Sequence, residues 1–352
     1  MTRQRRGRGQ SRRRISAGVA ASGSAVLVGI LAAVVVLLLL SDSPIATLRS
    51  FVLRPFSNAY FFGNMVSSAG YLLLAALGIV VSFRANLYNL GGDGQIYLGA
   101  LAGTLVALAL PDAPGLAGQV LILTAAASTG AALAGLAGVL KLIWDTPELI
   151  TTYLVSAALV PAATFYVTGP GRDAAGNLLA TPRVSESYWL AELLPPSELN
   201  SSVLIALLLA VVTAVVLFRT LPGYELRMYG ANAEFARYAG IRTEGVVIGA
   251  LSCSGALHGL TGGLMVLGTF HATISEFSLG LGWTAITVAL VGRLHPLGAI
   301  VSALLFSYLE AGAQMAMLET GFTFELGAVV QALILLFVTA EVARGFLERR
   351  NA

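Results

Sequence analysis

The sequence VLIALLLAVVTAVVLF at residues 203–218 contains no charged side chain, and Arg219 follows it directly. At about 1.5 Å per helical residue, such a run crosses most of the roughly 30 Å hydrocarbon core of a bilayer. The composition of the whole chain agrees, since 57% of its 352 residues are hydrophobic and 11% are charged. Soluble domains carry about 25% charged residues, so we exclude a water-soluble fold.

Nine more apolar runs follow the same pattern. The ten predicted spans are residues 18–40, 64–83, 92–110, 116–140, 148–168, 203–219, 246–268, 279–292, 297–317 and 326–343. Because backbone polar groups in hydrocarbon need internal partners, we expect these spans to be helices. The predicted fold is an all-α, polytopic membrane protein with about ten transmembrane helices, including broken or re-entrant segments and a cytoplasmic coupling helix. The eighth span is short, and Phe51 to Phe62 could be a loop or a re-entrant piece.

Basic residues orient the predicted helices, which explains the positive charge of the chain without nucleic acid. We place the basic tail 1–17 inside, before a transmembrane domain at 18–343. Strict alternation then places inside Arg84, Lys141, a coupling loop of about 220–245, Arg293 and the tail 344–352. This arrangement obeys the positive-inside rule and leaves both termini cytoplasmic. It also places residues of about 169–202 outside, where we expect a structured cap.

Polar side chains inside the predicted spans form three stripes at helical spacing. They are Asn64, Ser67, Ser68 and Tyr71; then Glu148, Thr152 and Ser156 with Thr151 beside them; and the pair Glu310 and Gln314. Polar residues in a membrane are costly and commonly functional, so the stripes could line a path for a solute. Alternatively, the hydroxyls bond carbonyl groups of their own helices, and Glu148 caps a helix that starts after Thr146-Pro147.

Small residues recur at four-residue intervals in two of the spans. They are Gly130, Ala134 and Gly138 in one and Gly255, Gly259 and Gly263 in the other. Small residues at this spacing let helix backbones approach closely, so we expect them at helix contacts. A hinge or a groove for the solute is the alternative.

The segment NLYNLGGDGQ at residues 86–95 places glycines, amides and a carboxylate between apolar runs. Glycine allows positive φ and close backbone contact, so we expect a helix to break and restart here near a solute. A phosphate-binding P-loop is excluded because it needs a lysine before serine or threonine, whereas Lys141, the only lysine, precedes Leu142.

The predicted inside loop LPGYELRMYGANAEFARYAGI at residues 221–241 is mixed in charge. From Asn232 it can form a short helix with Glu234 and Arg237 exposed and with Gly240 as a left-handed C-cap. A short helix outside the membrane can dock into a groove on a soluble partner. A merely solvated loop is the alternative.

Two of these segments resemble a known transporter group. Residues 89–95 are similar to the N-[IL]-G-x-[ED]-G-Q signature of ABC permeases of the branched-chain amino acid, ribose and nucleoside group. Residues 230–241 resemble the coupling segment of that group, G-x-N-x-x-A-A-x-Y-A-G-I, with Phe235 at a position that is usually small. The resemblance extends from about Asn64 to Glu341, and within the group the chain looks most like nucleoside or simple-sugar permeases.

The resemblance implies an importer in the bacterial cytoplasmic (inner) membrane. Its expected partners are a second permease subunit, usually a paralogue, a cytoplasmic ABC ATPase and an extracytoplasmic substrate-binding lipoprotein. ATP would bind to the ATPase, and this chain would hold no cofactor and no metal. With Arg237 added from its exposure, the predicted ATPase-coupling residues are Asn232, Glu234, Ala236, Arg237, Tyr238, Gly240 and Ile241. With the polar stripes, the predicted substrate-pathway residues are Asn64, Ser68, Asn86, Asn89, Gly91, Asp93, Gln95, Glu148, Thr151 and Thr152.

The predicted function is import of a nucleoside or simple sugar by alternating access, driven by the separate ATPase. An ion-coupled secondary transporter is the alternative, because Asp93 at a broken helix and Glu148 would also suit proton or sodium coupling. A membrane-embedded enzyme fits worst, since no metal-ligand spacing such as H-E-x-x-H and no Ser/His/Asp arrangement occurs.

Overall fold

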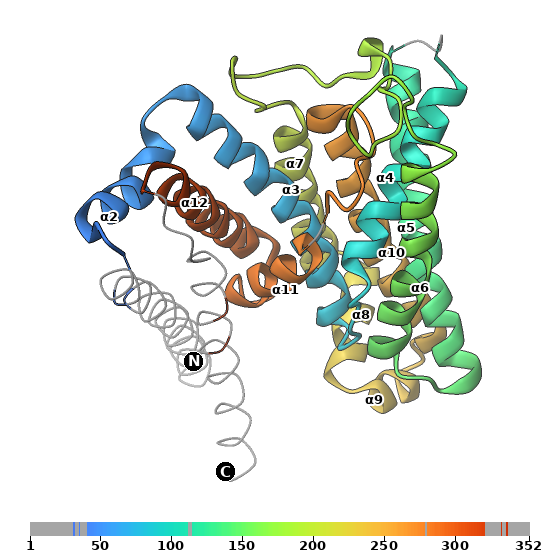
Figure 1. The fold of residues 1–352 in the computed structure, drawn as a ribbon. Coiled ribbons are helices and arrows are strands. Elements are labelled where there is room, and N and C mark those ends of the chain that lie inside the picture. The colour runs from blue at the N-terminus through green and yellow to red at the C-terminus, as the bar shows by residue number, and fades with distance from the viewer. Residues whose placement is uncertain are drawn as a thin grey trace. The chain divides into compact units, whose positions relative to one another are not determined.

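The computed structural model describes residues 31, 35, 41–111, 115–278, 280–320, 332 and 336. Every named element in these ranges is a helix (Figure 1). The expected all-α class is therefore confirmed for this part of the chain. The expected first and last spans and both terminal tails lie outside the described residues, apart from the four isolated positions.

The chain divides into two compact units, one of Met1–Asn58 with Tyr308–Ala352 and one of Ala59–Ser307. Among the described residues, the first unit contains α2 (Pro44–Leu53), η1 (Arg54–Phe56) and the end of α12 (Pro296–Thr320). In it, Ser50 donates a hydrogen bond to Glu319 at 2.5 Å, and the Tyr308 hydroxyl donates to the carbonyl of Val52 at 3.2 Å. Phe51 to Phe62 is thus no continuous loop, because it holds the end of α2, η1 and the start of α3.

The second unit contains the remaining helices. They are α3 (Ala59–Arg84), α4 (Gly92–Ala109), α5 (Gly115–Trp144), α6 (Glu148–Thr168), η2 (Glu186–Tyr188), α7 (Ser202–Arg219), α8 (Leu221–Ala231), α9 (Ala233–Tyr238), α10 (Thr243–Met265), the π-helix η3 (Val266–Phe270), α11 (Leu281–Val291) and the start of α12.

Six helices in the described ranges are long and apolar enough to cross a membrane: α3, α5, α6, α7, α10 continued by η3, and α12. The expected count of about ten is not confirmed. The predicted span at 92–110 is α4, whose first turn carries Asp93 and Gln95. The short eighth span is α11, whose 11 residues extend about 16 Å, or half of the hydrocarbon thickness.

The two stripes of small residues meet at the contact of α5 and α10. A Cβ atom added to Gly130 would lie 2.0 Å from the carbonyl oxygen of Gly255, and one added to Gly255 would lie 2.1 Å from that of Gly130. One added to Gly259 would lie 2.1 Å from the oxygen of Ala126. The expected close helix packing is confirmed, since only glycine fits these positions.

Residues 169–201 form an ordered cap whose backbone pairs with the segment after α10. Thr181 donates to the carbonyl of Thr273 at 3.0 Å, and Val184 donates to that of His271 at 2.8 Å. The rings of Trp189 and His271 stack with centroids 3.8 Å apart. The segment is ordered, as expected, while its place on the outer side of the membrane stays a prediction.

The described segments that we expected on the inside gather at one end of the second unit, as Figure 1 shows for α8 and α9. Arg84 donates to the carbonyl oxygens of Leu294 at 2.7 Å and Arg293 at 3.4 Å. Its guanidinium also lies over the ring of Phe218, 5.4 Å from the centroid. The cap lies at the opposite end, where the hydroxyl of Tyr188 donates to the carbonyl of Leu110.

Candidate functional site

The helix break expected at residues 86–95 is present, because α3 ends at Arg84 and α4 begins only at Gly92. Asn86 adopts a left-handed conformation with φ of 56°, which asparagine tolerates better than most residues. At Gly91 an added Cβ atom would lie 2.5 Å from the carbonyl oxygen of Thr152, so the backbone of the break touches α6 directly. We call residues 85–91 the break.

The polar stripe of α6 supplies hydrogen-bond partners for the break. Glu148 Oε1 accepts from the N–H of Tyr88 at 3.2 Å, and Thr152 Oγ1 accepts from that of Leu90 at 3.0 Å. Ser156 Oγ donates to the carbonyl of Gly91 at 2.9 Å. Non-helical backbone at membrane depth needs such partners inside the protein.

The side chains of this stripe bond to the break and, in part, to their own helix. Glu148 is the first residue of α6, and its carboxylate binds the N–H of Tyr88 and the ammonium of Lys141, not an N–H of its own helix. The hydroxyl of Thr152 does also bond its own helix, donating to the carbonyl of Glu148 at 2.7 Å. In this structure the stripe therefore faces the break and not an open path.

A fully buried amide network fixes the break to the middle of α10. Asn89 and Gln95 exchange two hydrogen bonds of 2.8 and 2.9 Å, and Asn89 Nδ2 also donates to Ser254 Oγ at 3.0 Å. His258 Nδ1 lies 2.8 Å from Gln95 Oε1, and its Nε2 lies 3.1 Å from the carbonyl oxygen of Ala75. This network joins the break to α3, α4 and α10 through buried polar contacts, which favours one arrangement of these helices.

Ser254 and His258 were missing from the sequence-based site. The available signal was two polar residues four positions apart inside the predicted span at 246–268, which places them on one helical face. Their partners, Asn89 in the break and Gln95 in α4, lie more than 160 positions earlier in the chain. Only the fold brings these residues together.

Asp93 lies where two helices begin side by side. Its Oδ1 accepts from the N–H of Gly282 at 2.6 Å, so the carboxylate binds the N-terminus of α11. A Cβ atom added to Gly282 would lie 2.5 Å from the nitrogen of Asp93, which shows how closely α4 and α11 approach. A carboxylate is favoured there by the partial positive charge of both helix N-termini.

The stripe on α3 anchors the cap. Asn64 Oδ1 accepts from the N–H of Glu198 at 2.8 Å, and Ser67 Oγ donates to the carbonyl of Glu198 at 3.1 Å. Tyr71 and the carbonyl of Gly268 both accept from Asn200 Nδ2, at 3.1 and 2.9 Å. Gly268 belongs to the π-helix η3, a kind of distortion that is common at functional sites.

The structure separates the ten predicted pathway residues by exposure. Asn89, Gly91, Gln95, Glu148 and Thr152 are buried; Asn64, Asp93 and Thr151 are half-buried; Ser68 and Asn86 are exposed. In the third stripe, which is exposed, Gln314 donates to Glu310 at 3.4 Å.

Helix α9 has the predicted caps. Asn232 Oδ1 accepts from the N–H of Phe235 at 2.9 Å, and Gly240 has φ of 82°. The N–H of Ile241 donates to the carbonyl of Ala236 at 3.0 Å and closes the helix. The expectation of a short, capped helix is confirmed, and its docking into a partner stays a prediction.

The outward surface of α9 is aromatic as well as charged. The side chain of Tyr238 is 91% exposed and that of Phe235 is 56% exposed, while Ala236 is fully buried. A cavity of about 130 Å³ lies under the helix, lined by Leu142, Tyr229, Ala233, Glu234, Arg237, Thr243 and Val247. Exposed aromatic side chains of this kind are common anchors of protein interfaces.

A comparison with known families identifies the chain. The family described as "Branched-chain amino acid transport system / permease component" matches residues 61–339. The chain belongs to this permease family. It is thus a component of a transport system and a multi-pass membrane protein, as the resemblance implied. No solved structure gives a significant match to the permease.

Curated relatives of the permease are similar over most of its length. The "Probable riboflavin import permease protein RfuC" of Treponema pallidum is 32% identical over 90% of this chain and 84% of its own length. The "Nucleoside ABC transporter permease protein NupB" of Lactococcus lactis is 28% identical over 90% and 89%. The "Glucose ABC transporter permease protein TsgB13" of Haloferax volcanii is 31% identical over 87% and 83%.

Proposed function

We propose that the chain is the membrane-spanning permease subunit of an ABC importer for a nucleoside or a simple sugar. The family and the names of the relatives support the transporter class. The main support for coupling to a separate ATPase is the capped helix α9, on which Tyr238 and Phe235 are exposed. A helix with unused aromatic surface at a polar end of the protein needs a partner to cover it.

We assign the ATPase contact to the face of α9 and its caps. Tyr238 and Phe235 would enter a groove of the ATPase, with Glu234 and Arg237 at the edges of the contact. Asn232 and Gly240 hold the two ends of the helix, and their roles are structural. ATP would bind to the ATPase, so the proposal requires no cofactor in this chain.

We assign the solute path to the region of the break, in a bacterial cytoplasmic membrane with about ten spans and cytoplasmic termini. In this conformation solute would meet the exposed Asn86 and the half-buried Asp93 near the break and the exposed Ser68 farther along α3 toward the cap. The buried Asn89, Gln95 and Thr152 would shape the path by holding the break. A second permease subunit, a paralogue, would supply the other wall, and a substrate-binding lipoprotein would deliver the solute to the cap.

The experiment is uptake into proteoliposomes that contain this chain, its partner permease, the ATPase and the binding protein. We expect ATP-dependent uptake of at least one labelled compound among guanosine, adenosine, uridine, ribose and glucose. In Glu234→Arg the reversed charge on α9 should weaken ATPase binding and abolish uptake.

The matched control is Glu186→Arg, the same change at an exposed position of the cap. We expect it to leave ATPase binding unchanged in a pull-down from detergent. Uptake that needs no ATP, is unchanged in Glu234→Arg and stops when the proton or sodium gradient is removed would contradict the proposal. That result would favour the ion-coupled alternative.

A further inference from the structure

The break is held by one charged residue, and this residue has two different partners. Glu148 Oε1 accepts from the N–H of Tyr88, while Glu148 Oε2 lies 2.7 Å from Nζ of Lys141. The side chain of Glu148 is only 9% exposed and that of Lys141 is 25% exposed. One carboxylate thus links the last turn of α5 to the backbone of the break.

Helix α8 also approaches the Lys141–Glu148 pair, through Tyr229. Tyr229 of α8 lines the cavity under α9 together with Arg237. The phenol of Tyr229 interacts electrostatically with Lys141 and Glu148 and also with Arg237 and Glu244. Burial is the main cause that raises the pKa of Tyr229, so the group stays a neutral phenol.

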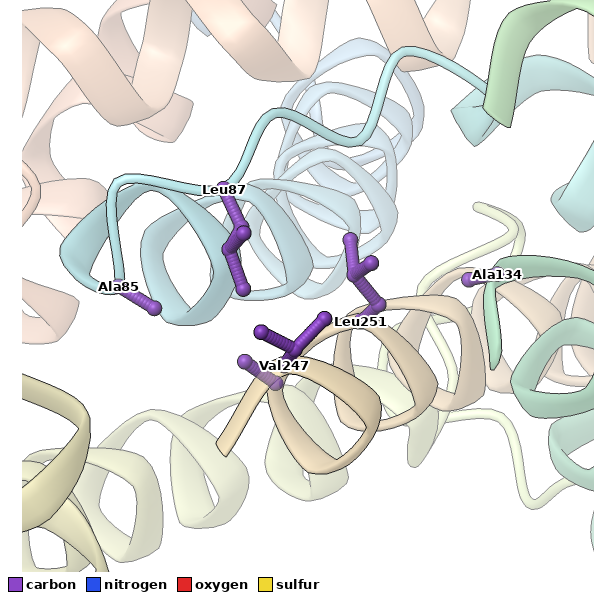
Figure 2. Close-up of a cluster of buried hydrophobic side chains, with 6 residues drawn as sticks. Ala85, Leu87, Ala134, Val247 and Leu251 are labelled. Atoms are coloured by element: carbon purple, nitrogen blue, oxygen red, sulfur yellow. The ribbon is translucent and has the colours of Figure 1, made fainter. Parts of the chain in front are cut away.

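The apolar side of the break packs against α8 as well. Ala85 and Leu87 belong to a buried cluster with Ala134, Val247, Ala250 and Leu251, and Leu226 and Tyr229 of α8 cover this cluster. Figure 2 shows Leu87 pointing from the break toward Val247 and Leu251 of α10. The contact is tight, since a Cβ atom added to Gly230 would lie 2.2 Å from the carbonyl oxygen of Arg84.

These contacts place the break between two supports. On one side is the backbone of α8, which continues through Asn232 into α9. On the other side is the pair Lys141–Glu148, which holds the N–H of Tyr88. A displacement of α9 and α8 must therefore move the break relative to Glu148 or carry both together, because packed elements transmit displacement.

We propose that Lys141 and Glu148 are positioning residues of transport, which hold the break at Tyr88 so that movement of α8 and α9 reaches it. This inference rests on the proposed function. Lys141 orients the carboxylate, and Glu148 supplies the acceptor for the backbone. Loss of either role should separate ATP hydrolysis from solute movement and leave the contact of α9 with the ATPase in place.

The test is the amount of solute imported per ATP hydrolysed by the complete complex in proteoliposomes. The informative variant is the exchange Lys141→Glu with Glu148→Lys, which restores an ion pair but puts a donor next to the N–H of Tyr88. We expect assembly and ATP hydrolysis close to wild type, with uptake per ATP lower by about tenfold. Glu148→Gln keeps an acceptor and should lose less.

Uptake per ATP at the wild-type value in the exchanged variant would overturn the inference, because the ion pair would then be only structural. If that variant does not assemble, Glu148→Asp tests the same point, since the shorter carboxylate cannot reach both partners and should lower uptake per ATP. The inference would also be overturned if the wild type shows ATP-dependent uptake and Glu148→Asp imports the same amount of solute per ATP. Absence of ATP-dependent uptake in wild type would instead reject the proposed function.

Discussion

The break and helix α9 were both predicted as functional from their polar residues, but these residues are mostly buried around the break and exposed on α9. At the break, Asn89, Gln95 and Thr152 are fully buried and bonded to other parts of the chain. On α9, Tyr238 is 91% exposed. Polar side chains at membrane depth first satisfy the backbone and one another, so only those with free surface are open to a partner. We expect substitutions at the break to affect folding and those on α9 to affect assembly.

The largest effect should come from Gly94→Val, beside the break. An added Cβ atom at Gly94 would lie 2.5 Å from Cβ of Ser156 and 3.0 Å from its Cα. Because backbone of α6 cannot give way cheaply, we expect a loss of about 3 kcal/mol or failure to fold. The thermal midpoint in detergent, followed by size-exclusion chromatography, measures this.

The control for this change is Gly249→Val on α10, where no atom lies within 4 Å of the added Cβ atom. We expect its thermal midpoint to stay close to wild type. Equal losses in both variants would mean that the contact between α4 and α6 is not as close as described.

The next effect should come from Asn89→Leu, which keeps the volume but removes four hydrogen bonds. Gln95 Nε2 and the N–H of Gly91 would lose their acceptor, and Gln95 Oε1 and Ser254 Oγ would each lose one donor. We expect a loss of about 2–3 kcal/mol, because buried polar groups without partners are costly. Asn86→Gly is the matched change at the exposed, left-handed end of the break and should be nearly neutral. A neutral Asn89→Leu would show that the amide network does not hold the break.

The prediction for α9 has the opposite character. Tyr238→Ala should leave the thermal midpoint unchanged, since the ring is almost fully exposed. It should weaken ATPase binding by about thirtyfold, as removal of an aromatic anchor costs about 2 kcal/mol. Binding of the purified ATPase by biolayer interferometry measures this. The control is Tyr60→Ala, an exposed tyrosine at the start of α3, far from α9. Equal ATPase affinity of the two variants would show that α9 is not part of the interface.

The smallest effect should come from Gly240→Ala. The residue has φ of 82°, and no atom lies within 4 Å of an added Cβ atom, so the cost is conformational alone. We expect about 1 kcal/mol, seen as a few-fold loss of ATPase affinity through a looser end of α9. Gly245→Ala, in open space and with ordinary φ, should not weaken binding. An unchanged affinity in Gly240→Ala would indicate that the ATPase itself orders the end of this helix.

Much of the architecture could be predicted from sequence because it rests on local patterns. Apolar runs gave the helices, Gly130 and Gly255 marked a close helix contact, and Asn232 with Gly240 marked the ends of α9. These signals depend on residues a few positions apart. The helix break was visible for the same reason.

The partners of the polar stripes could not be predicted in this way. A stripe such as Glu148, Thr152 and Ser156 looks the same whether it faces solute or the backbone of another segment. The structure shows that it faces the break. His258 was missed because its partner Gln95 lies 163 positions away. Long-range pairing of this kind depends on the packing of α4 against α10.

The most direct test of the contrast between the two regions is amide hydrogen exchange in the purified chain, alone and with the ATPase. We expect the amides of Tyr88, Leu90 and Gly91 to be protected already in the chain alone, because each has a partner within it. The amides of α9 also have partners within the chain, but this helix has only six residues and an exposed outer face, so we expect it to open readily. Residues 232–241 should therefore exchange faster than the break in the chain alone and become protected when the ATPase binds. Fast exchange at the break in the chain alone, or unchanged exchange of α9 in the complex, would contradict this division of roles.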